Sequence, residues 1–220
     1  MNAPCVLLDW GVEKLLRAYP GLRLQPTAGD NTSIAGNLEF SAQARGQKLI
    51  FDRYEISISV PPDYPRDIPS VRETAMRIPR NFHRSDTGHL CLGSPTRLRL
   101  ILAETPSLLS FVERCLIPYL YGYSIVESGG TLPFGELSHG AHGLRDDLAS
   151  MIGVINIPDD NNQVLLGFVR LLAMKKRKAN KRPCPCGTGI PLGRCHNRNL
   201  NVLRDKLGRA WFSSLLHGSC

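Results

Sequence analysis

Hydrophobic and polar residues alternate along two stretches in the first half of the chain. Apolar or small residues take every second position over 34–42 and again over 54–60. A period of two is typical of strands with one buried face. The turn-forming residues 45–47 lie between the two stretches, which predicts an antiparallel pair. A further strand is expected after the proline-rich segment 61–69.

Helical spacing of apolar residues precedes and follows these strands. A first helix is predicted around Trp10, Leu15 and Tyr19, with Asp9 as its cap and Pro20 at its end. After the strands, residues 107–121 carry an apolar face that suits a helix packed against the sheet. Pro118 is expected to kink or shorten it, because proline has no backbone N–H. The first part of the chain is therefore predicted to be α+β, with a helix before an antiparallel meander.

Three further helices are predicted in the second half of the chain. The first covers 144–151 and is followed by a loop over 155–162. The second covers 163–174, where nearly every residue is apolar, so this helix must be buried against another element. The last carries an apolar stripe between Val202 and Leu216. This stripe either packs on its own module, which we prefer, or binds a partner.

A polar loop over 81–89 leads to a single cysteine, Cys91. His83 and His89 lie in this loop, together with Ser85, Asp86 and Thr87. A thiol beside histidines is a candidate nucleophile, because nearby positive charge or hydrogen bonding favours the reactive thiolate. The alternative is that Cys91 is a small buried hydrophobe, since leucines flank it on both sides.

The stretch 54–91 resembles the core of ubiquitin-conjugating enzymes. The resemblance rests on an alternating strand, a proline turn and the sequence before the thiol: Pro61, Tyr64, Pro65, Pro69 and Val71, then Gly88-His89-Leu90-Cys91-Leu92. It implies a ubiquitin-conjugating-enzyme-like fold with an N-terminal helix, an antiparallel meander, an active-site loop and C-terminal helices. The family's His-Pro-Asn triplet falls on 81–83, so His83 replaces its asparagine. In this respect the chain resembles divergent bacterial members of the family.

The resemblance also implies a reaction and its partners. An activating enzyme would load a ubiquitin-like protein, or another protein with a C-terminal glycine tail, onto Cys91 as a thioester, and a lysine of a target would attack it. His83 is expected either to deprotonate that amine or to donate to the oxyanion, and His89 is the second candidate. Such bacterial relatives tend to be encoded in antiphage operons of the CBASS type, beside a cyclic-nucleotide synthase. An inactive binding module with the same fold is the alternative function.

The glycine-rich segment 121–143 is long for a connection inside a compact domain. Long loops of this kind are often lids or binding loops. Two interpretations stay open: the segment covers Cys91, or its histidines, His139 and His142, are solvated. The second is preferred.

A second cluster of candidate ligands lies near the C-terminus. Cys184 and Cys186 are followed by a glycine-rich turn and then by Cys195 and His196. Sulfur and imidazole nitrogen are the usual ligands of tetrahedral zinc, and four protein ligands make a closed, structural site. The pattern resembles the SEC-C zinc motif, which implies docking to a partner.

The composition is that of a globular protein, with 42% hydrophobic and 21% charged residues among 220. A basic run over 175–182 supplies much of the net charge of +8. We prefer a solvated linker to nucleic-acid binding as its meaning, although an adaptor that contacts nucleic acid stays open. The predicted domains are 1–155, 156–182 and 183–220. With no apolar span for a membrane, no secretion signal and seven cysteines that favour metal binding, the chain is expected in the cytoplasm.

Overall fold

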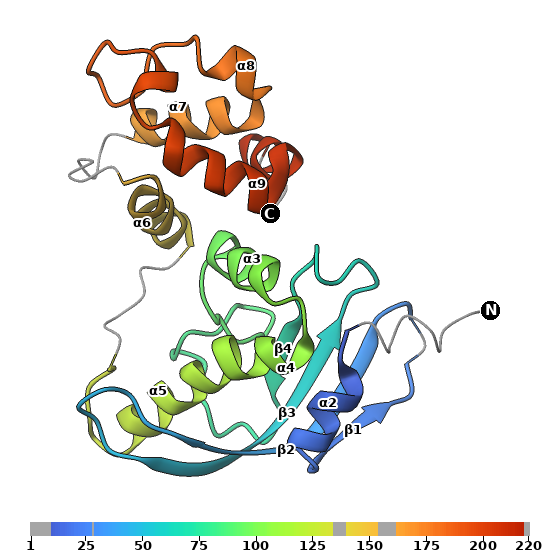
Figure 1. Cartoon of the computed structure of the whole chain (residues 1–220). Coiled ribbons are helices and arrows are strands. Elements are labelled where there is room, and N and C mark those ends of the chain that lie inside the picture. Colours follow the sequence, from blue (N-terminus) through green and yellow to red (C-terminus); the bar gives the residue numbers. More distant parts are fainter. Residues whose placement is uncertain (1–9, 28, 134–139, 154–161, 218–220) are drawn as a thin grey trace. The chain divides into compact units, whose positions relative to one another are not determined.

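The computed structural model describes residues 10–27, 29–133, 140–153 and 162–217. The chain folds as two compact units, Met1–Leu137 and Ser138–Cys220 (Figure 1). This division lies earlier than the boundary expected after residue 155. The reason is that helix α6 (Gly140–Ile152) packs with the later helices, and the Asn199 side chain donates to the Ile152 carbonyl at 2.8 Å. Each unit is described by itself below.

The first unit contains a four-stranded antiparallel sheet in the order β1-β2-β3-β4. The strands are β1 (Leu22–Gln25), β2 (Thr32–Ala42), β3 (Ile50–Val60) and β4 (Ser70–Glu73). Ile34 lies opposite Ile58, and both are buried. The predicted meander is thereby confirmed. Strand β1 was not predicted, because only one of its four residues is buried and no alternation can be read from it.

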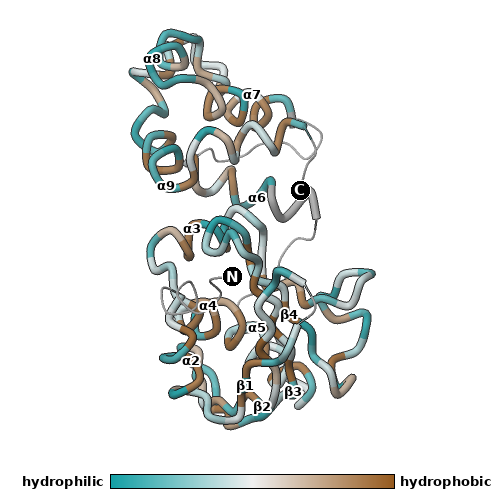
Figure 2. The backbone as a smooth tube through the Cα atoms, turned by 90° about the vertical axis from the view of Figure 1, so that its right-hand side faces the viewer, coloured by the Kyte–Doolittle hydropathy of each residue, from teal (hydrophilic) through white to brown (hydrophobic). Residues whose placement is uncertain are grey.

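Besides the sheet, the first unit contains the helices α2 (Val12–Ala18), α3 (Pro95–Glu104), α4 (Leu108–Phe111), the π-helix η1 (Val112–Leu116) and α5 (Ile117–Glu127). Helices α4 and α5 lie along one face of this sheet, and α2 and α3 pack against α4. Figure 2 shows hydrophobic residues along α4 and α5. Helix α3 was not predicted; it begins with Pro95 and is capped by the Ser94 hydroxyl. The expected cap Asp9 lies outside the described residues.

The helical stretch η1–α5 is longer and less regular than predicted. Pro118 has no N–H for the Arg114 carbonyl, and the turn before it is π-helical, with the Ile117 N–H bonded to the Val112 carbonyl. The irregularity expected at this proline is confirmed. The loop expected over 121–143 is wrong at both ends: 121–127 continue α5, because most of these residues are buried, and 140–143 begin α6. His139 lies outside the described residues, as does the side chain of His142.

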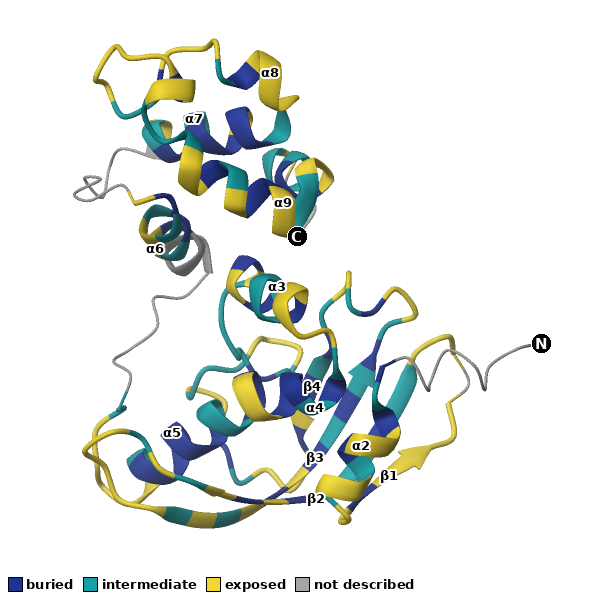
Figure 3. Ribbon diagram, in the orientation of Figure 1, coloured by how far each residue is buried: buried dark blue, intermediate teal, exposed yellow. Residues whose placement is uncertain are grey.

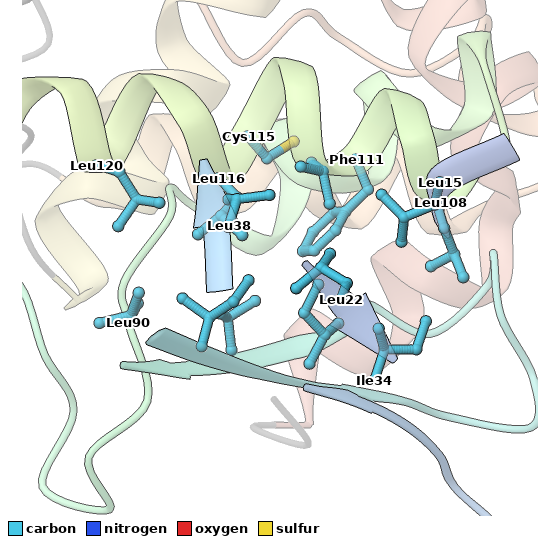
Figure 4. Packing of buried hydrophobic residues seen from close by; sticks show 14 of the residues in the cluster. Leu15, Leu22, Ile34, Leu38, Leu90, Leu108, Phe111, Cys115, Leu116 and Leu120 are labelled. Atoms are coloured by element: carbon cyan, nitrogen blue, oxygen red, sulfur yellow. The ribbon is translucent and has the colours of Figure 1, made fainter. Parts of the chain in front are cut away.

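The core of the first unit fills the space between the sheet and α4–α5. Figure 3 shows the buried positions along these helices and strands. Figure 4 shows Phe111 and Leu116 pointing toward the strand residues Ile34 and Leu38. All four side chains are fully buried. This packing fixes α5 over the sheet and so determines where its polar side chains meet the loop before Cys91.

A charged cluster fastens the start of that loop to the sheet. Arg77 forms ion pairs with Asp52 at 2.8 Å and with Glu127, and its guanidinium lies 4.3 Å from the centre of the Tyr54 ring. Although burial opposes ionisation of Asp52, hydrogen bonds from Arg77 and Ser124 hold its pKa below the usual value. The cluster therefore joins the loop, β3 and α5 through charged hydrogen bonds.

The second unit is helical. Besides α6 it contains α7 (Asn162–Ala173), α8 (Lys176–Ala179), the 3-10 turn η2 (Leu192–Arg194) and α9 (Asn197–Leu216), which is kinked at Gly208. The predicted burial of the helix over 163–174 is confirmed: α7 packs on α9. At the C-terminal end of α7, the buried Arg204 donates to the Leu171 carbonyl at 2.9 Å. Among the described helices, none combines the length and apolar character that crossing a bilayer requires.

Candidate functional site

A short turn presents Cys91 at the edge of the sheet. Arg84 and Leu90 form an antiparallel bridge, and the Ser85 N–H bonds to the His89 carbonyl at 2.8 Å. The Leu90 N–H then bonds to Val71 of β4, also at 2.8 Å. Leu90 is buried, whereas Cys91 is only partly buried. The side chain that anchors the loop is therefore Leu90, and the thiol beside it keeps access to solvent.

The backbone around Cys91 is held by a tyrosine from α5. The Cys91 N–H bonds to the His83 carbonyl at 2.8 Å. The Tyr119 hydroxyl donates to the Phe82 carbonyl at 3.0 Å and to the His83 carbonyl at 3.2 Å. Burial, and next the charge of Cys91, raise the pKa of Tyr119, so it remains a donor at neutral pH. Tyr119 therefore positions the loop that carries the thiol.

In the sequence, Tyr119 stands out only as part of an apolar helix face. A hydroxyl on such a face is a usable signal, because a buried Tyr O–H needs a hydrogen-bond partner. What the pattern could not give is the identity of that partner, since the two carbonyls lie 36 and 37 residues away in sequence.

The two candidate histidines occupy different surroundings. His83 has a positive φ of 40°, its ring packs against Phe82 at 4.9 Å, and its carbonyl accepts from Cys91. The ring Nδ1 of His89 lies 2.9 Å from the Thr87 hydroxyl. The structure thus brings the backbone of His83 to Cys91 and fixes the ring of His89 within its own turn.

The surroundings of the loop keep the Cys91 thiol and the His89 imidazole neutral at pH 7. Burial raises the pKa of the Cys91 thiol. Burial, and next the positive charge of Arg72, lower the pKa of His89. A neutral histidine can accept a proton but is a poor source of positive charge for a thiolate. The loop as it stands therefore holds a thiol and an unprotonated imidazole.

A cavity of about 320 Å³ opens beside the loop that carries Cys91; it is lined by His83 and Leu92 of this loop and not by Cys91 itself. His83 and Leu92, the latter next to Cys91 in the chain, form one wall, and Leu98 and Ile101 of α3 form another. Cys115 also lines the cavity; it is almost fully buried, and burial raises its pKa to about 11. Cys115 is thus part of the hydrophobic core. A mainly apolar cavity of this size can accommodate a short peptide segment beside the Cys91 loop.

The four ligands predicted near the C-terminus are brought together. The ligand atoms of Cys184, Cys186, Cys195 and His196 all lie within 4.8 Å of one another. The Sγ atoms of Cys186 and Cys195 are 3.6 Å apart, and His196 Nδ1 lies 3.2 Å from the Sγ atoms of Cys184 and Cys195. A tetrahedral ion with bonds of about 2.3 Å to sulfur separates its sulfur ligands by about 3.8 Å. The cluster can therefore hold a metal ion.

Helix α7 supports this metal-binding turn. The Phe168 ring packs against the His196 ring at 5.3 Å. A Cβ placed on Gly167 would lie 2.9 Å from Cβ of Pro185, which stands between two of the cysteines. Gly167 is thus needed for the close approach of helix and turn, a role that its place in an apolar run did not reveal.

Comparison with known proteins gives no relative: no family model and no curated protein matches the chain. The function is therefore inferred from the residues and their geometry. Two sites support the inference, the thiol at Cys91 and the Cys/His cluster.

Proposed function

We propose that the first unit is a ubiquitin-conjugating-like enzyme that carries a protein C-terminus as a thioester on Cys91. The observation that carries this proposal is a partly exposed thiol in a hydrogen-bonded loop beside an apolar cavity. The order of elements, a helix, four antiparallel strands, the loop and then helices, supports a fold of that family. So does the sequence 88–92 around the thiol.

The chemistry needs one thiolate and two acyl transfers. The Cys91 thiolate attacks the activated carbonyl of the donor's C-terminal glycine, and the leaving group of the activating enzyme departs. A lysine amine of the target then attacks the thioester carbonyl, the bond to Cys91 Sγ breaks, and the amine loses a proton as the isopeptide forms. Since burial disfavours the thiolate, loading is expected to be slow at neutral pH without help from a partner.

The proton of the attacking amine needs an acceptor near the thiol. His89, whose pKa is lowered by burial and by Arg72, is unprotonated at pH 7 and fits that role. His83, whose carbonyl accepts from the Cys91 N–H, lines the cavity beside this loop and stays the candidate for contact with the oxyanion. Both histidines are kept as candidates, and the hydroxyl of Tyr119 holds the loop backbone at Phe82 and His83.

The Cys/His cluster of the second unit is proposed to bind zinc. Three thiolates and one imidazole are the donor set that Zn²⁺ prefers, and four protein ligands leave no open position for a substrate. The ion would therefore be structural, and it would hold 184–196 against α7. As in SEC-C segments, this module is proposed to dock on a partner.

The partners of the reaction are proposed from the family resemblance. They are an activating enzyme, a donor with a C-terminal glycine tail, and a target lysine, with a cyclic-nucleotide synthase of an antiphage operon as one candidate donor or target.

The decisive experiment is intact mass spectrometry after incubation with activating enzyme, ATP and donor. We expect an adduct of the donor mass less one water on the native chain, released by excess thiol. It should be absent in Cys91→Ala and become thiol-resistant in Cys91→Ser, where an oxygen ester replaces the thioester. Cys115→Ala is the matched control, because that thiol is buried in the core.

Two results would point away from this function. An adduct that persists in Cys91→Ala would show that a residue other than Cys91 is the nucleophile. Failure of a folded native chain to load any donor would leave the first unit as a binding module that keeps the fold but not the reaction.

A further inference from the structure

The net positive charge of the chain comes entirely from its second unit. Residues 1–137 contain 14 basic and 14 acidic residues, whereas residues 138–220 contain 13 basic and 5 acidic ones. The net charge of +8 is therefore absent from the unit that carries Cys91. In addition, the sequence has no acidic residue between Asp160 and Asp205. A charge so unevenly distributed indicates a polyanionic partner for the second unit.

Seven of these cations form a basic surface on α8 and the turn beside it. The basic surface consists of residues 175–178, Lys181, Arg182 and Arg194, all of which are exposed (Figure 3). Within the described part of the chain, none of the seven is in an ion pair. Their charge is thus available to a partner.

Backbone hydrogen bonds hold the basic surface together. The Leu192 N–H bonds to the Arg182 carbonyl at 2.9 Å, and the Gly193 N–H bonds to the Asn180 carbonyl at 3.1 Å. Arg194 is thereby placed next to the end of α8. Ala179, the apolar residue of this short helix, is fully buried and points away from solvent. The surface is therefore a fixed part of the metal-binding turn and not a free linker.

The chemistry of the basic surface selects among polyanions. A membrane-binding helix needs exposed apolar residues beside its cations, and a protein interface needs an apolar centre. The large apolar residues exposed in the described part of the second unit are Ile190, a single residue of the turn, and Val202 on α9, so no group of apolar side chains lies among the seven cations. A dense set of lysines and arginines without an apolar centre suits phosphate contacts instead.

We infer that the second unit binds the phosphate backbone of nucleic acid through the basic surface, without reading base sequence. Guanidinium and ammonium groups pair with phosphate oxygens, and binding releases the counterions of the nucleic acid. This site would hold the chain on DNA or RNA whatever Cys91 does, so its test does not depend on the conjugation reaction.

The test is fluorescence anisotropy with the full-length, zinc-loaded protein. The probes are a fluorescein-labelled DNA duplex of about 20 base pairs with mixed sequence and a single-stranded RNA of about 20 nucleotides. For about six phosphate contacts on the duplex, affinity should fall about a thousandfold between 50 and 200 mM salt. Tighter binding of one probe identifies the preferred nucleic acid, and scrambling its sequence should change affinity less than about threefold.

The variant Lys175→Gln, Lys176→Gln, Arg177→Gln, Lys178→Gln should weaken binding at least about tenfold at 100 mM salt. Its salt dependence should flatten by about three to four units of slope, since each phosphate contact contributes about 0.9. The matched control removes four exposed cations of the first unit: Lys14→Gln, Arg17→Gln, Arg45→Gln and Arg66→Gln. It changes the net charge equally and should leave affinity within about twofold.

Folding and rival partners are tested alongside. Bound zinc and circular dichroism establish that each variant is folded, and Lys181→Gln with Arg194→Gln provides a second variant that leaves α8 intact. The inference is overturned if neither probe binds at 100 mM salt, or if the control weakens binding as much as the α8 variant. Tighter binding of phosphatidylserine vesicles or polyglutamate than of either nucleic acid would also overturn it.

Discussion

Single hydroxyl and thiol groups decide the properties of the loop that carries Cys91. The Tyr119 hydroxyl contacts two successive carbonyls, and the second of these, His83, also accepts from the Cys91 N–H. The thiol is partly buried, and its pKa is raised for that reason alone. Loop order and thiol reactivity are therefore set by separate groups, and they can be tested separately.

Removal of the Tyr119 hydroxyl should loosen the loop without disturbing the core. Tyr119→Phe loses a hydrogen bond worth about 1 kcal/mol, so amide exchange in 82–91 should rise about fivefold. Tyr121→Phe is the matched control, because its hydroxyl bonds to the Lys48 carbonyl at 2.9 Å instead. Hydrogen exchange read by mass spectrometry checks this, and equal protection of 82–91 in both variants would contradict it.

The reactivity of Cys91 should keep increasing up to a higher pH than is usual for a cysteine. Burial favours the neutral thiol, so ionisation moves to a pH above that of an unfolded cysteine. Below that pKa, alkylation by iodoacetamide should accelerate about tenfold per pH unit. Peptide mapping gives the rate at Cys91, with the urea-unfolded chain as reference. A midpoint at or below that of the unfolded chain would show that another group stabilises the thiolate.

At the scale of elements, the close packing of a turn against helix α7 explains a glycine in that helix that helix propensity does not explain. The turn that carries the metal ligands lies against α7, where Gly167 faces Pro185 and Phe168 faces His196. Glycine weakens a helix interior by about 1 kcal/mol relative to alanine. Its presence in α7 is explained by the space that the turn requires.

Gly167→Ala should therefore destabilise the second unit, although alanine is the better helix former. The new Cβ would lie 2.9 Å from Pro185, a rigid residue, so the turn would have to move. We expect zinc affinity to fall about tenfold, as measured by competition with a chromophoric chelator. Gln163→Ala, at an exposed position of the same helix, should leave affinity unchanged. Unchanged or higher affinity in Gly167→Ala would refute the role of this contact.

At the scale of the whole molecule, the two units differ in what stabilises them. The first has a sheet and a continuous apolar core. The second has a smaller set of packed helices, and its turn over 184–196 depends on four potential ligands. The chain contains two tryptophans, and each unit holds one, Trp10 in the first and Trp211 in the second. Both are buried, so each reports on its own unit.

Chelation should unfold the second unit and spare the first. Metal binding supplies folding free energy to small modules, so excess EDTA should shift the emission of Trp211 to longer wavelength, observed alone in Trp10→Phe. Emission of Trp10, observed alone in Trp211→Phe, should stay unchanged because it packs against Tyr64 at 5.6 Å inside the other core. If the emission of Trp211 stays native after verified metal loss, helix packing alone is sufficient to keep the second unit folded.

The sequence by itself determined the strands over 34–42 and 54–60, the α+β class and the four ligands of the Cys/His cluster. Alternation and ligand spacing are local properties, and they can be read along the chain. The tertiary structure decided that Tyr119 holds the Cys91 loop, that Gly167 admits Pro185 and that 121–127 stay helical. These features depend on contacts between residues distant in sequence, and no periodicity encodes which distant residues will meet.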